Sequence, residues 1–313
     1  MQHIEIELET YLPESVAGKR LDSALSSIYS DYSREQLKRW ITDGKIKLNG
    51  KVITKGRTIV AGGEHVTINA TLEDRSNWTA DAIPLNIEYE DDDIIIINKP
   101  VGLVTHPGAG NPNNTLAGAL LHHIPALKKV PRAGLIHRLD KNTSGFLVVA
   151  KTMIAHTKLT GMMQQRLIKR QYLALVEGLL RKAGTVTSDI GRNPRARTKM
   201  AVVPTGKPAI THYQPQRYYR AHTLLDVTLE TGRTHQIRVH MAHIKHPIVG
   251  DKTYGAKLRL PKGCSIELQT ALHNFNHQAL HATSLALRHP TREQEITITA
   301  PPPKDFADIL KQL

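Results

Sequence analysis

The sequence predicts an α+β protein, in which a mixed, mainly antiparallel sheet domain follows a small αα-β domain. From residue 83 onward, short β-rich runs dominate, and the helical stretches between them do not alternate strictly with strands. Residues 18–68 instead show helical periodicity followed by a hairpin signal. An acidic stretch with few apolar residues, 71–82, separates the two and is expected to be a linker. The predicted domains are therefore 1–70 and 83–313.

Two helices and a hairpin are expected in the small domain. The first helix is indicated by apolar residues spaced for one face: Leu21, Ala24, Leu25 and Ile28. The second is expected to begin after Ser33, which forms a capping box with Gln36, and to stop at Gly44. Alternating residues then run into Asn49-Gly50, a dipeptide typical of a hairpin turn.

Basic side chains decorate this small domain, and they include Lys19, Arg20, Arg34, Lys38 and Arg39. A solvated basic face is the ordinary interpretation, but so many cations on a small helical unit favour RNA contact. The domain resembles the S4 RNA-binding domain in the following elements: Arg20-Leu-Asp22, Ser33-Arg34, Gly44-Lys-Ile-Lys-Leu-Asn-Gly50 and Gly63-Glu-His-Val66. The resemblance implies an RNA partner without naming a reaction.

The larger domain is expected to contain short strands and intervening helices. Strands are indicated at Ile94–Ile97, Phe146–Ala150, Tyr172–Val176, Leu224–Leu229 and Ile296–Ile298. Helices are expected near 114–123, 153–167 and 234–244, with a short terminal helix at about 304–312.

Charge is distributed unevenly along the chain, whose formal net charge is +14. Residues 99–313 hold 31 Lys and Arg against 11 Asp and Glu, and within them residues 151–220 hold 14 against 2. A basic field of this strength favours a polyanionic partner, with nucleic acid first. A generically basic soluble protein is the alternative that charge alone leaves open.

Other broad classes are disfavoured by composition. A single cysteine, Cys264, excludes an internal disulfide and a cysteine-cluster zinc site. No segment approaches the roughly 18 apolar residues of a membrane span, and the polar N-terminus does not read as a secretion signal. We therefore expect a cytoplasmic protein that does not associate with membranes.

One carboxylate, Asp140, lies among cations in the segment Leu135-Ile-His-Arg-Leu-Asp-Lys141. Neighbouring cations keep a carboxyl group ionised, and an ionised carboxylate can act as a nucleophile or base. Strong local charge is common and catalysis is rare, so this segment alone favours a structural ion pair.

Three further segments could carry chemistry. Glu230–Met241 places Arg233 at an expected strand-to-helix turn, where Thr234 could cap the helix and Ile237 lies on its apolar face. Lys169–Val176 offers Tyr172 inside a basic strand, either as a core residue or as a phenol that stacks on a base. Asn98–Gly110 is a Gly/Pro-rich turn without the spacing of a phosphate loop, so no nucleotide cofactor is indicated. His235 and His240 are five apart and do not share a helix face, which disfavours a metal site.

Together these segments resemble the RluA-type family of pseudouridine synthases. The match follows the order Asn98-Lys-Pro-x-Gly-Leu, His137-Arg-Leu-Asp-x-x-Thr-Ser-Gly145, Tyr172-x-Ala-Leu-Val176, Thr231-Gly-Arg-Thr-His-Gln-Ile-Arg-Val-His240, His246-Pro-Ile-Val-Gly-Asp251 and Ala279-Leu-His-Ala282. Within the family, the S4-like domain and local similarities point to a branch that modifies uridines in a hairpin of 23S ribosomal RNA of the large subunit. The chain departs from that pattern at Phe146, usually leucine, and at His277, which replaces an arginine.

The resemblance implies a mechanism and a set of residues. A uridine must leave the helical stack before its glycosidic bond can be reached. Asp140 is then expected to start cleavage, with Arg233 paired to it and Tyr172 packed on the flipped base. Arg138 is expected to fill the gap that the base leaves, and His137 and Ile237 to lie at the substrate. No cofactor is needed, and a monomer bound to ribosomal RNA or to the pre-50S particle is expected.

Two alternatives remain on the sequence. A non-catalytic RNA-binding or ribosome-assembly protein would fit the S4-like domain and the basic field equally well. A carboxylate in a polyanion site argues against that alternative, because it would only repel phosphate. The same chemistry on transfer RNA is the second alternative, against which only the S4-like domain and the local similarities argue.

Overall fold

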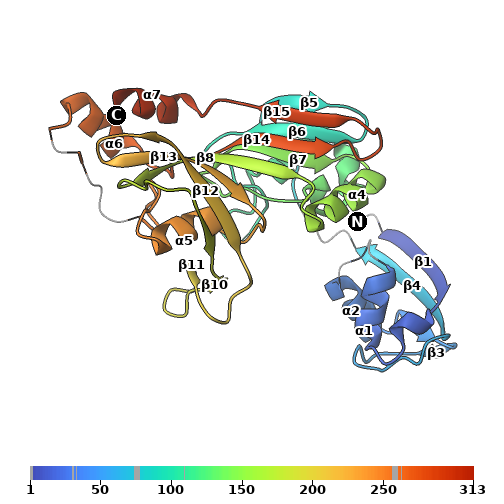
Figure 1. The fold of residues 1–313 in the computed structure, drawn as a ribbon. Helices are drawn as coiled ribbons and strands as arrows, with labels where there is room; N and C mark the ends of the chain where they lie inside the picture. The colour runs from blue at the N-terminus through green and yellow to red at the C-terminus, as the bar shows by residue number, and fades with distance from the viewer. Residues whose placement is uncertain are drawn as a thin grey trace. The chain divides into compact units, whose positions relative to one another are not determined.

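The protein folds into two compact units, Met1–Asn77 and Trp78–Leu313. The structure, a computed structural model, describes residues 3–29, 32, 34–73, 78–108, 110–255, 260–261 and 263–313 (Figure 1). No helix in these residues is long and apolar enough to cross a membrane.

The first unit packs two helices on one sheet. Its elements are β1 (His3–Tyr11), η1 (Glu14–Val16), α1 (Leu21–Ile28), α2 (Arg34–Thr42), β2 (Ile46–Leu48), β3 (Lys51–Val52) and β4 (His65–Glu73). The strands form an antiparallel sheet in the order β1-β4-β2-β3. Its core is built from apolar side chains of both layers, including Leu21, Leu25, Leu37, Trp40, Ile46 and Ile68. The unit therefore has a core of its own.

The expected helices and hairpin of the first unit are present. α1 spans the predicted apolar face, and the positive φ of Gly44 (68°) follows the end of α2. Asn49 and Gly50 take positive φ values of 48° and 78°, as a type I′ hairpin turn requires. Ser33, the expected cap of α2, lies outside the described residues. The stretch expected to be a linker, 71–82, contains the last residues of β4, and its residues 74–77 also lie outside the description.

The second unit is organised around a long sheet. Its strands are β5 (Ile87–Glu90), β6 (Ile94–Lys99), β7 (Ser144–Ala150), β8 (Lys169–Glu177), β9 (Gly184–Thr187), β10 (Ile190–Arg192), β11 (Met200–Val202), β12 (Ile210–Tyr218), β13 (His222–Leu229), β14 (Leu280–Arg288) and β15 (Glu295–Thr299). Its helices are α3 (Leu116–His123), η2 (Pro125–Lys129), η3 (Pro131–Gly134), α4 (Met153–Gln164), α5 (Gln236–His243), α6 (Ile266–Asn274) and α7 (Lys304–Gln312).

In the part of the chain that is described, nine strands join in the order β5-β6-β7-β14-β8-β13-β12-β9, with β15 paired to β14. Every pairing is antiparallel except β7 with β14, which is parallel over two residue pairs. β10 and β11 form a separate two-stranded hairpin. This mixed sheet with helices confirms the predicted α+β class. The five predicted strands and the four predicted helices, α3, α4, α5 and α7, are present. The elements that were not predicted include α6, the strands β5, β9, β12 and β14, and the β10–β11 hairpin.

Opposite faces of the long sheet carry separate clusters of buried side chains. The larger cluster includes Leu139, Tyr172, Ile237 and Leu280, so it reaches from β8 to α5. A second cluster gathers around α4 and includes Phe146, one of the two positions that depart from the family pattern. The other, His277, pairs with Asp305 of α7 (Nε2–Oδ2, 2.6 Å). The larger cluster therefore contains two of the predicted site residues, Tyr172 and Ile237, and packing within it fixes their side chains.

Candidate active site

A cavity of about 320 Å³ opens where β8, α5 and the loop before β7 meet. Its lining contains many of the residues singled out in the sequence, namely His137, Arg138, Asp140, Tyr172, Arg233 and Ile237. It also contains His235, considered above only as a metal ligand, and residues that were not singled out, including His106, Arg132, Arg170 and Arg238. The cavity therefore collects segments that lie far apart in the chain.

Asp140 stands on a loop that is pinned from several sides. Its neighbour Leu139 is buried, and the Leu139 carbonyl accepts a hydrogen bond from Thr105 Oγ1 (2.7 Å). The Lys141 carbonyl accepts from the ammonium of Lys99 (3.1 Å), which is fully buried and lies on β6. Thr143 N donates to the Asp140 carbonyl (3.1 Å). These bonds fix the backbone, so the carboxylate is presented at one position.

The partner of Asp140 is Arg238, not the expected Arg233. Arg238 Nη1 donates to Asp140 Oδ2 (2.9 Å), while its Nε and Nη2 donate to the two oxygens of Asp251 (2.7 and 2.9 Å). Arg233 precedes α5, and its Nε donates to the Pro208 carbonyl (3.0 Å). The start of α5 explains why Arg238 and not Arg233 pairs with Asp140. The helix begins at Gln236, so Arg238 lies in its first turn and Arg233 lies before it.

Asp251 accepts two hydrogen bonds from the Arg238 guanidinium, and this bidentate pairing fixes the guanidinium before any substrate arrives. The Asp251 side chain is completely buried, and its Oδ1 also accepts the backbone N–H groups of Thr253 (2.9 Å) and Tyr254 (3.2 Å). The two carboxylates raise the pKa of Arg238, against the opposing effect of its burial, so the guanidinium stays charged. Asp140 is therefore paired while 15% of its side chain remains exposed.

Tyr254 and His235 extend this arrangement. The guanidinium carbon of Arg238 lies 5.0 Å from the centre of the Tyr254 ring. The Tyr254 oxygen accepts from Met200 N (2.9 Å) and lies 2.7 Å from His235 Nδ1. Donation of the phenolic proton to Nδ1 would leave the His235 proton on Nε2, which lies 3.8 Å from Asp140 Oδ1. Burial lowers the pKa of His235, which favours this neutral ring.

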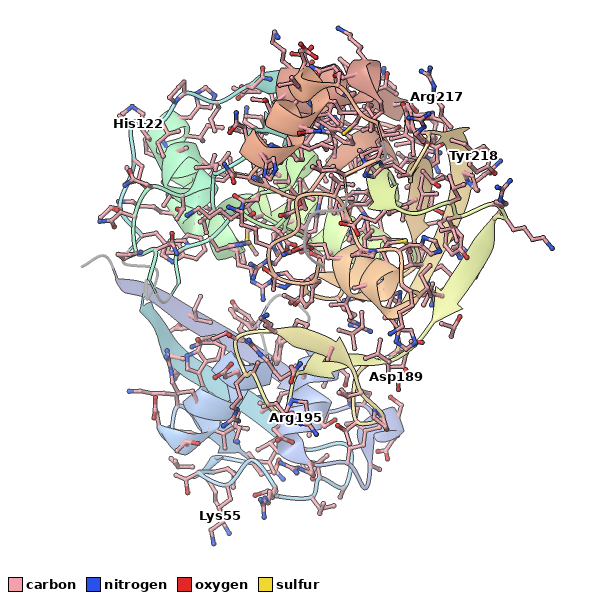
Figure 2. The ribbon with its side chains drawn as sticks, turned by 90° about the vertical axis from the view of Figure 1, so that its left-hand side faces the viewer. Lys55, His122, Asp189, Arg195, Arg217 and Tyr218 are labelled. Carbon is pink, nitrogen blue, oxygen red and sulfur yellow. The ribbon has the colours of Figure 1, made fainter. Side chains whose placement is uncertain are left out.

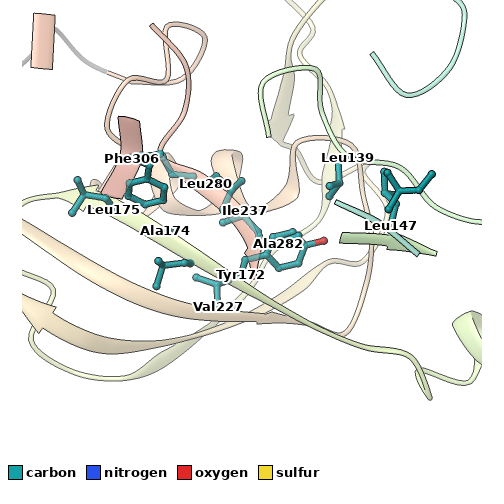
Figure 3. Close-up of a cluster of buried hydrophobic side chains, with 14 of the residues drawn as sticks. Leu139, Leu147, Tyr172, Ala174, Leu175, Val227, Ile237, Leu280, Ala282 and Phe306 are labelled. Carbon is teal, nitrogen blue, oxygen red and sulfur yellow. The ribbon is translucent and has the colours of Figure 1, made fainter. Parts of the chain in front are cut away.

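Tyr172 stands on β8 with its ring in the cluster beneath the cavity. Figure 3 shows it among Leu139, Ile237 and Leu280, which belong to the buried cluster. Its side chain is nearly buried, and this burial raises the pKa of the phenol. Ile237, in the first turn of α5, supplies a second apolar contact. A planar base entering the cavity would thus meet an aromatic ring and a branched aliphatic side chain next to Asp140.

Three further lining residues, His106, His137 and Arg170, bring buried nitrogen atoms to the cavity. His106 Nε2, His137 Nδ1 and Arg170 Nε are buried and have no hydrogen-bond partner among the described residues. Burial, together with the charge of nearby arginines, lowers the pKa of His106 to about 4 and that of His137 to about 3. Both rings are therefore neutral at pH 7. His137 Nε2 accepts from Val148 N (3.3 Å), and Arg138 is exposed at the rim.

The cations expected to bind RNA in the first unit have different environments. Lys19 and Lys38 are exposed. Arg20 instead holds the buried carboxylate of Asp22 (Nη2–Oδ2, 2.6 Å), and Arg39 lies 4.0 Å from Asp43. Arg34 begins α2, and its side chain lies outside the description. These residues belong to a separate unit, so they are not part of the cavity in Trp78–Leu313.

Sequence reasoning missed Arg238, Asp251, Tyr254 and Arg170. Arg238 and Asp251 lie inside quoted motifs, but spacing alone could not show which arginine faces Asp140. Thr234 was also wrongly expected to cap α5, which is preceded by His235 in a left-handed conformation (φ 57°). Among the described residues, no group of three or more His, Cys, Asp or Glu side chains is arranged to hold a metal ion. His240 is buried instead against Thr211 and the Ser188 carbonyl.

The chain is similar in sequence to known proteins. Residues 93–243 match the family model described as RNA pseudouridylate synthase, and residues 19–66 match the S4 domain. The chain is 49% identical over 309 residues to ribosomal large subunit pseudouridine synthase D of Vibrio parahaemolyticus, covering 99% of this chain and 95% of that protein. It is 51% identical over 306 residues to the protein of the same name from Escherichia coli, covering 98% and 94%.

Solved structures give the same result at lower identity. The chain is similar to human RNA pseudouridylate synthase domain containing 1, with a TM-score of 0.54, 26% identity, and coverage of 71% of this chain and 85% of that one. It is also similar to human RNA pseudouridylate synthase domain containing 4, with a TM-score of 0.55, 26% identity, and coverage of 72% and 92%.

Proposed function

The chain belongs to the RNA pseudouridine synthase family. On this basis we propose that the protein isomerises a uridine in ribosomal RNA of the large subunit and that Asp140 is its catalytic carboxylate. The observation that carries the proposal is the Asp140 carboxylate, which Arg238 holds at the edge of a cavity rich in cations. A pure RNA binder would gain nothing from a fixed carboxylate facing phosphates. An isomerase needs such a group at the glycosidic bond.

The reaction requires one bond to break and another to form on the same base. The N1–C1′ bond is cleaved, the uracil turns, and C5 joins C1′ while the C5 proton leaves and N1 gains one. A base in a stacked helix cannot do this, so it must be flipped out. In the proposed complex Tyr172 packs on the flipped base, and Asp140 starts the cleavage at the sugar. Isomerisation needs neither a redox step nor phosphate transfer.

The protein supplies orientation and electrostatics for these steps. Arg238, itself held by Asp251, keeps the Asp140 carboxylate ionised and aimed. The unpartnered nitrogens of His106, His137 and Arg170 can serve the polar edge of the uracil or the neighbouring phosphates. Arg138, two residues before Asp140, is exposed and lines the cavity, and in the proposed complex it fills the gap left in the RNA stack. Arg233 also lines the cavity and is assigned to phosphate contact.

Replacement of Asp140 by asparagine tests this proposal. Asp140→Asn removes the charge while Arg238 keeps its two bonds to Asp251, so the fold should persist. We expect pseudouridine formation, followed as tritium released from C5-labelled uridine, to fall at least about a thousandfold. RNA affinity should change little. An Asp140→Asn protein that releases tritium at the normal rate would disprove the assignment.

The choice of large-subunit RNA has its own support and its own test. The curated relatives named above carry that substrate in their names, and an S4 domain matches at residues 19–66. We further propose that the protein acts in the cytoplasm, as a monomer, on this RNA or on the pre-50S particle. Pseudouridine mapping of total RNA, with and without the protein, should show sites lost from large-subunit RNA. Loss confined to transfer RNA would contradict the choice.

A further inference from the structure

A basic hairpin lies next to the active site without lining its cavity. It comprises β10, β11 and the turn between them, residues 190–202, and Figure 1 shows it projecting beyond α5, away from the nine-stranded sheet. Figure 2 labels Asp189 at its root and Arg195 toward its tip. Its cations, all exposed, are Arg192, Arg195, Arg197 and Lys199. None of the four has a carboxylate partner among the described residues.

The tip of this hairpin is internally ordered. Asn193 Oδ1 accepts from the backbone N–H groups of Arg195 (2.9 Å) and Ala196 (3.1 Å). Arg192 Nη1 donates to the Arg197 carbonyl (3.1 Å), and Asn193 N donates to the Lys199 carbonyl (2.9 Å). The turn therefore holds its cations at defined places, which reduces the entropy lost when they bind phosphates.

The root of the hairpin is fastened to the active site. Met200 N donates to the Tyr254 oxygen (2.9 Å), and Lys199 Nζ donates to the Thr253 carbonyl (3.1 Å). Ile190 at the root also packs with Val239 of α5 in a small buried cluster that Tyr254 joins. Tyr254 in turn lies against the Arg238 guanidinium, the partner of Asp140. A continuous set of contacts thus runs from the hairpin to the catalytic carboxylate.

We propose that the β10–β11 hairpin grips the RNA backbone and that Tyr254 transmits this grip to the Arg238–Asp140 pair. Tyr254 is then a positioning residue, and the active site is fully aligned only when RNA phosphates hold the hairpin. This inference rests on the proposed function for its substrate. RNA is the occupant favoured by charge complementarity, because four exposed cations on one ordered hairpin, none with a carboxylate partner among the described residues, match a chain of phosphates.

The grip is tested by neutralising two cations at the tip. Arg195→Gln/Arg197→Gln should weaken binding to a large-subunit RNA transcript about 3- to 10-fold at moderate salt. It should also flatten the dependence of log Kd on log salt concentration by about one to two units. The control is Arg181→Gln/Lys182→Gln. Both cations are exposed and follow the C-terminal end of β8, whereas Tyr172 lies in the N-terminal half of that strand. Equal salt slopes for the tip variant and the wild type would overturn the grip.

The transmission is tested by removing one oxygen. Tyr254→Phe keeps the ring over Arg238 but loses the links to Met200 and His235, so kcat should fall roughly 10- to 100-fold while Kd for RNA stays within about twofold. Tyr218→Phe is the matched control, because its hydroxyl donates to the Arg181 carbonyl at the surface (2.9 Å) and, among the described residues, is not linked to Arg238 or Asp140. A Tyr254→Phe enzyme with unchanged kcat would refute the transmission.

Combining the two changes separates coupling from independent defects. In the wild-type background, the tip substitutions should lower kcat at saturating RNA as well as affinity. In the Tyr254→Phe background they should lower affinity alone, because the link is already cut. Strictly additive effects on kcat would count against the proposal. An inactive wild type would instead overturn the proposed function, while the salt slopes would still decide whether the hairpin binds RNA.

Discussion

At the scale of single residues, Asp251 illustrates how a group that touches no substrate can control one that does. It is completely buried, and it takes both a two-point bond from Arg238 and two backbone N–H groups of its own loop. A carboxylate in that position is stable only because the positive charge beside it is equally fixed. Asp251 therefore fixes the position of the Arg238 guanidinium, and with it the distance from Arg238 to Asp140.

Asp251→Asn should consequently impair catalysis more than binding. An amide offers one acceptor where the carboxylate offered two, so Arg238 should shift and Asp140 lose its alignment. We expect kcat to fall roughly 10- to 100-fold with little change in Kd for RNA, as measured by single-turnover tritium release. Asp305→Asn, which alters a half-exposed pair with His277, is the control and should keep full activity. A normal kcat for Asp251→Asn would contradict this assignment.

At this scale the sequence points to one residue where a motif contains a single candidate, and it cannot choose where a motif contains two. Asp140 is the single carboxylate in its segment, and the structure places it in the cavity. The segment Thr231–His240 contains both Arg233 and Arg238, and the choice between them depends on where the helix begins. That start is set by His235 in a left-handed conformation and by Gln236 Oε1, which accepts from Arg233 N (3.0 Å). No spacing rule encodes those local bonds.

At the scale of elements, the parallel pairing of β7 with β14 depends on a glycine. Gly145 has φ of 110°, and a Cβ there would lie 2.2 Å from the Ala282 carbonyl oxygen. The two strands can approach only because that position has no side chain. Since β7 begins just after the Asp140 loop, this contact also anchors the catalytic carboxylate.

Gly145→Ala should therefore destabilise the second unit by about 2–4 kcal/mol, from the positive φ and the backbone overlap together. The measurement is the shift in the urea midpoint of the transition that abolishes activity. Gly161→Ala is a matched control, because that glycine lies within α4, with no positive φ and no atom within 4 Å of an added Cβ. It should be neutral or stabilise by up to about 1 kcal/mol. Equal midpoints for the two variants would contradict the argument.

β1 and the β10–β11 hairpin are among the elements that were not predicted from the sequence. The N-terminus alternates Ile4, Ile6 and Leu8 with acidic residues, and this period-two pattern indicates a strand. The structure has this strand as β1, which pairs with β4 along its whole length and was not predicted. The basic hairpin was missed for another reason: its strands have three residues each, too short for any periodicity to show.

At the scale of the whole molecule, each unit has a buried core of its own. The cavity, its carboxylate and the basic hairpin all belong to Trp78–Leu313. The S4 domain, with exposed Lys19 and Lys38, belongs to Met1–Asn77. Chemistry and part of the RNA affinity should therefore be separable by truncation.

Deletion of residues 1–77 should weaken the binding of structured ribosomal RNA more than it slows the chemical step. Each RNA phosphate that the S4 domain neutralises should contribute about 0.7–0.9 to the slope of log Kd against log salt, so the slope should fall accordingly. Because Asp140, Arg238 and Asp251 stay in place, kcat at saturating RNA should remain within about threefold. The comparison requires equilibrium binding at several salt concentrations and single-turnover tritium release for both proteins. Equal affinity and equal salt slope for the truncated and full-length proteins would show that the S4 domain does not contribute to RNA binding. A large loss of kcat at saturating RNA would show that the second unit needs the first for catalysis.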